Sequence, residues 1–181
     1  MKNVNLQDIR DKLDFATWVD HILQDNKQNT PPVNVFNIAH NENIELGHLS
    51  KRKVQNGRVE GKLYFHTRNK QWVIRYNKDN SLTGQRIIVA HELGHYFLHK
   101  TSFEDTDEIL FRNIQWDLYE LQANQFAAEL LMPKSMIIKY GLHVAERSES
   151  KPHFVKLMSQ TFLVSREAMQ YRLYNMGLTD L

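Results

Sequence analysis

The sequence of 181 residues contains no cysteine. A disulfide framework and a thiolate metal site are therefore both excluded, and any bound metal must be held by histidine, aspartate, glutamate or water. No apolar run approaches the roughly 18 residues that a membrane-spanning helix needs. The opening segment, MKNVNLQDIRDKLDFATW, carries charges where a signal peptide has its apolar core. We therefore expect a cytoplasmic protein that does not contact a membrane.

An excess of charge of either sign is also missing. The chain has 23 Lys and Arg against 21 Asp and Glu, which gives a net charge of only +2. Proteins that bind nucleic acids typically present a dense basic face, so direct nucleic-acid binding is not expected. The length suits one domain with a true hydrophobic core and a small appendage.

Strand-like and helical patterns alternate in the first half of the chain. Apolar spacing predicts a helix over residues 6–25, which the prolines of NKQNTPP end, and a shorter helix over residues 33–46. The runs VEGKLYFHT and QWVIRYN predict an antiparallel hairpin over residues 59–77. The turn signal Asn56-Gly57 predicts one more strand near residues 49–54.

The second half of the chain is helical in pattern. One helix is expected over residues 85–99, with Ser81 or Thr83 as its N-cap, and another over residues 114–132. Together with the hairpin, these patterns predict an α+β fold with a small antiparallel sheet.

The chain ends in two short predicted helices, with Ser165 as the N-cap of the second and Gly177 as its end. We predict an N-terminal helical extension over residues 1–30 and one domain over residues 31–181. Residues 150–181 form the C-terminal helical subregion of that domain.

The segment RIIVAHELGHYFLHK contains HELGH, an H-E-x-x-H pattern. His91 and His95 lie about one helical turn apart, so both imidazoles can reach one ion. Glu92 is one position further on and is free to act on a water, which is the arrangement a zinc hydrolase needs. The alternative is a helix that carries surface or core histidines. Gly94 costs about 1 kcal/mol inside a helix, which indicates close approach by another element.

A catalytic metal site needs three protein ligands and one open position. His99 continues the series but lies about 12 Å from His91 along the helix, which favours a supporting or packing role. On the following helix, Glu120 and Asn124 share a stripe whose next members are apolar. A lone carboxylate there is costly unless a cation compensates it. We therefore predict Glu120 as the third ligand and Asn124 as a hydrogen-bond acceptor for a ligand histidine.

RIIVAHELGHYFLH and the later E-x-x-A-N-x-F-A-A-E-L-L-M-P together resemble the ImmA/IrrE family of intracellular metallopeptidases. The resemblance covers about residues 31–177 and includes PPVNVFNIAHNENIEL, WVIRYN and VSREAMQYRLYNMGL. It implies a zincin-like metallopeptidase core. In that core His91, His95 and Glu120 bind zinc, and Glu92 is the general base of an endopeptidase.

The resemblance also implies a protein substrate, namely a DNA-binding transcriptional repressor encoded nearby on a mobile element or stress locus. Two features depart from the family pattern: Gln122 stands where an acidic residue is common, and an extra N-terminal helix replaces a repressor-like DNA-binding module. The competing hypothesis is a metal-binding regulatory or toxin–antitoxin partner that acts by protein binding with little or no proteolysis.

Several roles stay open at this level. The predicted hairpin can present an edge strand to an extended peptide. Tyr96 and His99 are candidates for contacts with the substrate or the transition state, although packing is the commoner role for such side chains. The N-terminal helix can pack on the domain, mediate dimerisation or hold a partner. The sequence does not define the oligomeric state or the cleavage site.

Overall fold

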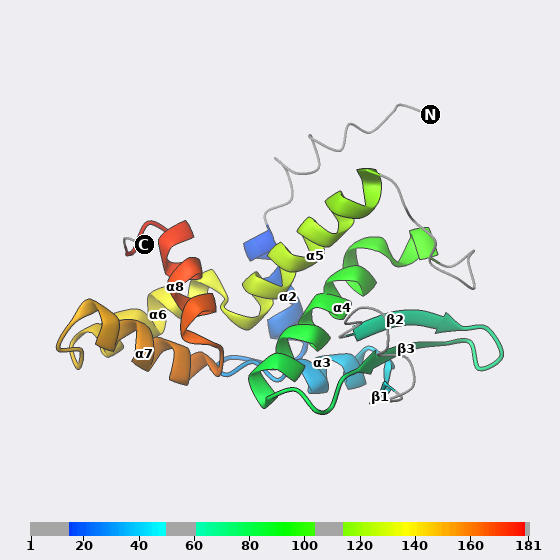
Figure 1. The fold of residues 1–181 in the computed structure, drawn as a ribbon, viewed down its shortest axis with the longest axis horizontal. Helices are drawn as coiled ribbons and strands as arrows, with labels where there is room; N and C mark the ends of the chain where they lie inside the picture. Colours follow the sequence, from blue (N-terminus) through cyan, green and yellow to red (C-terminus); the bar gives the residue numbers. More distant parts are fainter. Residues whose placement is uncertain (1–14, 50–60, 104–113, 180–181) are drawn as a thin grey trace.

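The computed structural model describes residues 15–49, 61–103 and 114–179 of the chain (Figure 1). Its strands are β1 (Glu45–His48), β2 (Gly61–His66) and β3 (Gln71–Tyr76). Its helices are α2 (Phe15–Asp25), α3 (Val35–Asn41), α4 (Leu82–Phe103), α5 (Ile114–Leu131), α6 (Lys134–Ala145), α7 (Lys151–Phe162) and α8 (Arg166–Asn175). The predicted α+β class is confirmed. Across these described segments, none of the helices combines the length and the apolar character needed to cross a membrane.

The three strands form a mixed sheet in the order β1-β3-β2. β2 and β3 form the predicted antiparallel hairpin, with Leu63 opposite Ile74. β1 lies on the other side of β3 and runs parallel to it. The prediction of a purely antiparallel sheet is therefore wrong. The strand predicted near residues 49–54 falls, apart from its first residue, outside the described residues.

Non-local contacts place β1, which explains why a local pattern did not reveal it. The prediction for residues 33–46 was a single helix, but α3 ends at Asn41 and the chain is already extended from Glu45. Arg75 on β3 forms an ion pair with Glu45 at 2.7 Å. The arginine crosses Gly47, where an added Cβ would lie 1.6 Å from its Nη1 atom. The register of β1 thus depends on a residue about thirty positions away.

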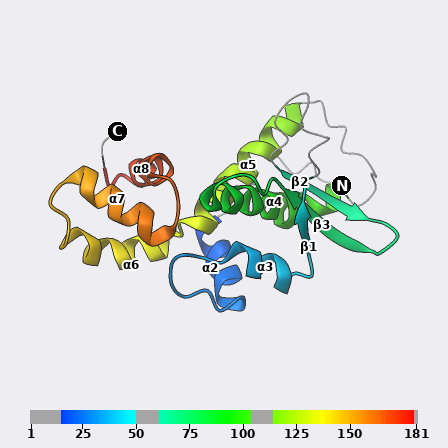
Figure 2. The ribbon, with the colours of Figure 1, turned by 60° about the horizontal axis from the view of Figure 1, so that its bottom comes forward.

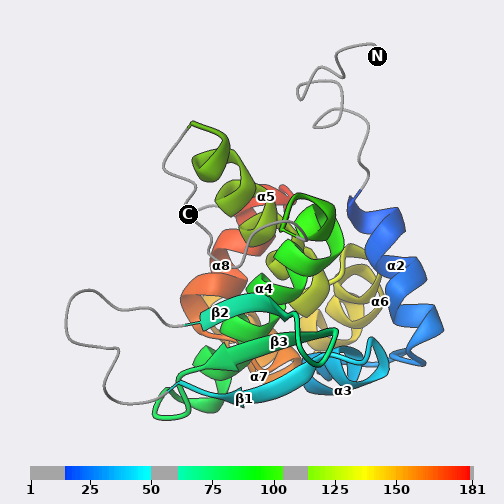
Figure 3. The ribbon, with the colours of Figure 1, turned by 90° about the vertical axis from the view of Figure 1, so that its right-hand side faces the viewer.

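α4 lies between the sheet and α5 (Figure 3). Its sheet-facing side carries Tyr96, whose ring meets Trp72 of β3 edge-on at a centroid distance of 5.8 Å. On the opposite side is Gly94, where an added Cβ would lie only 2.9 Å from the Cα of Ala123 on α5. The close approach predicted from the glycine is confirmed. Ser81 is the N-cap of α4, because its hydroxyl accepts from the backbone N–H of Gly84 at 3.2 Å.

α2 packs on the domain, which is one of the three roles left open for the N-terminal helix. Val19, Ile22 and Leu23 belong to the main hydrophobic core. Trp18 meets the rings of Phe97 and Phe126 edge-on. The part of the predicted helix before residue 15 lies outside the described residues, and the division of the chain at residue 30 stays a prediction.

The C-terminal helices α6, α7 and α8 form a unit beside the α4–α5 pair (Figure 2). Ser165 caps α8 by accepting from the N–H of Ala168 at 3.1 Å, and Gly177 follows the helix with a φ of +69°, both as predicted. Arg86 of α4 links this unit to the domain. Its buried guanidinium donates to the carbonyl oxygens of Phe162 and Leu163, each at 3.2 Å, and of Val33 at 2.8 Å.

Candidate metal centre

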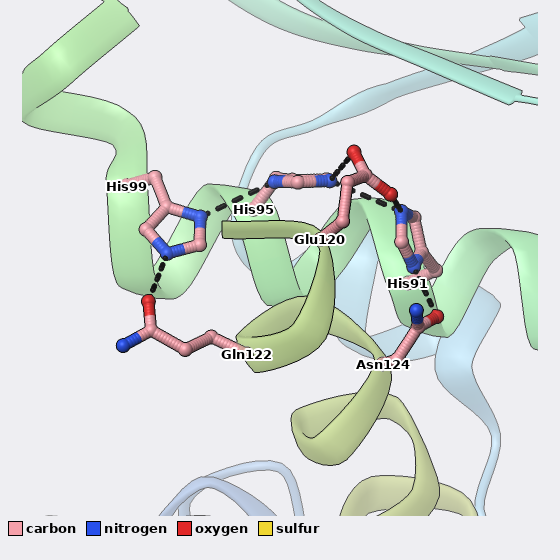
Figure 4. A network of polar contacts seen from close by, with 6 residues as sticks. All are labelled: His91, His95, His99, Glu120, Gln122 and Asn124. Carbon is pink, nitrogen blue, oxygen red and sulfur yellow. Dashed lines mark hydrogen bonds and ion pairs between the residues drawn. The ribbon is translucent and has the colours of Figure 1, made fainter. Parts of the chain in front are cut away.

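Two helices bring His91, His95 and Glu120 together (Figure 4). The Nε2 atoms of His91 and His95 on α4 lie 3.0 Å apart. Each of these nitrogens lies 3.2 Å from a different carboxylate oxygen of Glu120 on α5. Three ligand atoms from positions 91, 95 and 120 thus converge on one point, although only the first two are close in sequence.

Asn124 lies one turn after Glu120 and contacts His91 from behind. Its Oδ1 is 2.9 Å from the Nδ1 of His91. An amide oxygen only accepts, so Nδ1 carries the proton and donates it. The Nε2 atom of a neutral His91 then holds a lone pair and faces the other two ligand atoms.

This donor set fits a transition-metal ion. Bonds of about 2.0–2.1 Å in a tetrahedron place neighbouring ligand atoms roughly 3.3 Å apart, close to the 3.0–3.2 Å observed between the three groups. Imidazole ligands suit zinc and its neighbours, whereas calcium and magnesium prefer oxygen alone. The His95 side chain is only 6% exposed and that of Glu120 is 33% exposed, so the centre is buried on one side and open on the other.

The pKa values of Glu120 and His91 are both shifted by their contacts at the centre. The hydrogen-bond contacts between Glu120 and the two histidines, His91 and His95, hold the pKa of the Glu120 carboxyl well below its usual range. Burial opposes protonation of His91, but the hydrogen bond to Glu120 and the charge of Glu92 outweigh it, so the pKa of His91 lies above its usual value. The two pKa values move in opposite directions, and each shift favours the charged form of its residue, because a carboxylate and an imidazole lie together here. A metal ion would supply the positive charge that the Glu120 carboxylate favours.

Glu92 lies on the neighbouring face of α4, against β2. Glu92 is 7% exposed, and its carboxylate accepts a hydrogen bond from the backbone N–H of Leu63. Burial raises its pKa to about 7; the charge of His91 opposes that shift, and the charge of Glu120 adds to it. A carboxyl with a pKa near neutrality can both take up and release a proton at the pH of a cell.

Gly61 of β2 gives this carboxylate its room. An added Cβ at Gly61 would lie 2.6 Å from the Oε1 of Glu92 and 2.5 Å from the Cγ2 of Ile88. The hairpin pattern in the sequence shows a glycine at the start of a strand, but nothing in that pattern shows that it faces a glutamate about thirty residues later. Sequence reasoning therefore missed both Gly61 and the backbone N–H of Leu63.

The other two predicted candidates lie behind the centre or away from it. His99 is buried; its Nδ1 is 3.2 Å from the Nδ1 of His95, and its ring stacks on Tyr119 at 4.2 Å. Burial lowers the pKa of His99 to about 4, which keeps the imidazole neutral. Tyr96 is 7% exposed and packs against Trp72, so its ring belongs to the interface with the sheet.

A small mixed sheet, a helix with H-E-x-x-H and a second helix with a convergent glutamate define an arrangement consistent with the zincin-like class of metal sites. Residues 47–174 match the model of the IrrE N-terminal-like domain. That match spans most of the chain, so the protein belongs to the IrrE N-terminal-like domain family of peptidases.

Individual relatives agree with this assignment. Over 81 residues the chain is 35% identical to the metallopeptidase ImmA of Bacillus subtilis, a stretch that makes up 45% of this chain and 46% of that relative. The chain thus spans about half the length of the curated relative it matches. A solved structure, a Mycobacterium tuberculosis transcriptional regulator, superposes on 88% of this chain and 46% of its own with a TM-score of 0.59. At 17% identity, that likeness concerns the fold alone.

Proposed function

We propose that the protein is a zinc-dependent endopeptidase that cleaves a specific intracellular protein, a DNA-binding transcriptional repressor. The observation that carries the proposal is the pairing of a convergent His91, His95 and Glu120 cluster with a buried carboxylate, Glu92, beside it. A metal site that only stabilises a fold has no use for such a carboxylate. The choice of a repressor as substrate rests on the family resemblance, and the choice of zinc rests on the two imidazoles and one carboxylate.

In the proposed reaction, His91, His95 and Glu120 hold the ion, and a bound zinc would supply Lewis-acid polarisation of water and of the scissile carbonyl. Glu92 takes a proton from the attacking water at a carboxylate oxygen and later gives it to the leaving amine nitrogen. The raised pKa of Glu92 matches both halves of this task. The backbone hydrogen bond from Leu63 favours the ionised form of Glu92, which is the form that accepts the proton.

The sheet offers a place for the substrate. Among the described strands β2 is an outer strand, because β3 lies on one side of it only. Leu63 of β2 contributes a backbone hydrogen bond to Glu92, so β2 passes directly beside the proposed base. We expect an extended peptide to lie along the outer edge of β2.

The test is cleavage of a repressor encoded next to the gene, co-expressed with the wild-type protein, with Glu92→Gln or with Glu146→Gln. Glu146 is an exposed carboxylate at the end of α6 and serves as the matched control. Wild type and Glu146→Gln should yield fragments, whereas Glu92→Gln should bind zinc and yield none. Cleavage by Glu92→Gln at the wild-type rate would rule out the mechanism. Loss of repression without fragments, undiminished in Glu92→Gln, would favour the protein-binding alternative.

A further inference from the structure

A line of three buried side chains runs from the candidate metal centre into the protein (Figure 4). The Nδ1 of His95 contacts the Nδ1 of His99 at 3.2 Å, and the Nε2 of His99 contacts the Oε1 of Gln122 at 3.0 Å. The exposed fraction is 4% for each histidine and 8% for Gln122. His99 is held flat against Tyr119, with 28° between the ring planes.

With the Oε1 atom of Gln122 facing His99, the direction of the hydrogen bonds follows from the chemistry of the groups. The amide oxygen of Gln122 only accepts, so His99 donates to it from Nε2. A neutral imidazole has one N–H, so the Nδ1 of His99 carries a lone pair and accepts from His95. A neutral His95 therefore has its proton on Nδ1, which leaves the lone pair on Nε2, the atom that faces His91 and Glu120.

Hydrogen bonds running in the opposite direction, from Gln122 through His99 to His95, would prevent a metal ion from binding. If the amide nitrogen of Gln122 faced His99, it would donate to Nε2, and His99 would donate from Nδ1 to His95. The proton of His95 would then sit on Nε2, between the three ligand atoms, where it excludes a metal ion. The orientation of the Gln122 amide on α5 thus decides which ring nitrogen of His95 on α4 carries the proton and which carries the lone pair.

We propose that His99 and Gln122 are positioning residues that hold His95 in the Nδ1–H tautomer and so keep its Nε2 atom ready for a metal ion. The inference rests on the metal site of the proposed function. If the inference is right, the two ligand histidines are oriented by different kinds of hydrogen-bond partner. His91 is oriented directly by the amide of Asn124, whereas His95 is oriented by an amide through a second imidazole.

The first measurement is the affinity for Zn²⁺ by competition with a chromophoric chelator. Gln122→Leu removes the terminal acceptor, and we expect its affinity to fall about ten- to hundredfold. An ionised carboxylate in Gln122→Glu offers only acceptor oxygens, so the direction is fixed and the affinity should equal or exceed that of wild type at a pH at which the carboxylate is ionised. Gln125→Leu is the matched control, since this exposed glutamine lies on the same helix and should leave the affinity unchanged.

The second measurement is the histidine tautomer in the zinc-free protein, read from the ring-nitrogen chemical shifts of ¹⁵N-histidine samples. Wild type and Gln122→Glu should show His95 with a protonated Nδ1, and Gln122→Leu should show a mixture. A purely structural role would lower stability without moving this signature. His95 protonated on Nε2 in the wild type, or equal zinc affinities of Gln122→Leu and Gln125→Leu, would overturn the proposal.

The tautomer measurement also separates this inference from the proposed function. If the wild-type protein does not bind Zn²⁺, the metal site itself is refuted, and the spectra of the zinc-free protein still show whether Gln122 sets the state of His95. If zinc binds and no protein is cleaved, the proposed endopeptidase activity is refuted, and the positioning role of His99 and Gln122 stands. Because wild type and Gln122→Glu alone can decide the tautomer, failure of Gln122→Leu to fold would not remove the test.

Discussion

Replacing Gly94 by alanine would test how tightly the distance between α4 and α5 governs the metal centre. The new Cβ would lie 2.9 Å from the Cα of Ala123 and 3.0 Å from its carbonyl oxygen. Both contacts are to backbone, so no side chain can turn away to relieve them. Carbon atoms pack best at roughly 3.5–4.0 Å, so α5 must move away by about 0.6 Å or more.

That movement is large compared with what a metal site tolerates. Glu120 lies one turn before Ala123 on the same helix and moves with it, whereas ligand distances in metal sites hold to about 0.2 Å. We expect the affinity for Zn²⁺ to fall at least tenfold. Alanine gains about 1 kcal/mol of helix propensity over glycine, and overpacking costs about 1–3 kcal/mol. The free energy of unfolding of the zinc-free protein should therefore change by between zero and a loss of about 2 kcal/mol.

The matched control is Gly141→Ala in α6, where the new Cβ would meet its nearest neighbours, Met158 and Phe154, at an ordinary 3.9 Å. This variant should gain up to about 1 kcal/mol and keep its zinc affinity. Chelator competition measures the affinity, and urea unfolding of the zinc-free proteins measures the stability. The reasoning is refuted if the two alanine variants behave alike in both assays.

Three further variants test the surroundings of the centre. In the zinc-free protein, burial holds the pKa of Glu92 at about 7, above its ordinary value of 4.5. The free energy of unfolding of the wild type should therefore fall as the pH rises from 4.5 through 7. Glu92→Gln should then gain on the order of 3 kcal/mol over wild type at pH 8 in urea unfolding, and a difference that does not vary with pH would contradict this. Gly61→Ala pushes a Cβ toward the Glu92 carboxylate, so cleavage should fall about a hundredfold with zinc affinity retained. The control Gly141→Ala, whose new Cβ meets no atom closer than 3.9 Å, should cleave normally. Arg86→Leu leaves three carbonyl groups without their donor and should lower the free energy of unfolding by about 3 kcal/mol. The exposed control Arg147→Leu should change the free energy of unfolding by no more than about 0.5 kcal/mol. Equal losses in the two variants would refute the role of Arg86.

Much of the fold followed from local patterns. The hairpin and the helices α4, α5 and α8 were predicted because their apolar periods and caps lie within one segment, as with Ser165 at the start of α8. Apolar spacing alone did not reveal β1, because a four-residue strand carries almost no period of its own. Its place beside β3 depends on contacts such as the ion pair of Glu45 with Arg75.

In the candidate site, too, the features that could be predicted are those that depend on spacing within one helix. The spacing of His91 and His95 points both rings to one place in any α-helix, since the geometry is set by backbone hydrogen bonds within a single turn. The free-energy cost of burying the Glu120 carboxylate could also be predicted from the sequence. The partly buried helix face that carries Glu120 follows from the apolar residues spaced at the helical period. The assignment of these residues as zinc ligands, and of Glu92 as base, stays a prediction.

The sequence by itself determined that any metal here is held without thiolates, that two histidines share a helix face, and that Gly94 admits a close neighbour. Only the tertiary structure decided which backbone approaches that glycine, which N–H holds Glu92, and which amide lies at the end of the line from His95 through His99. The reason is physical. Spacing within a helix is fixed by bonds between residues a few positions apart, whereas the partners of Gly94, Glu92 and His99 come from elements whose placement depends on the packing of the whole core.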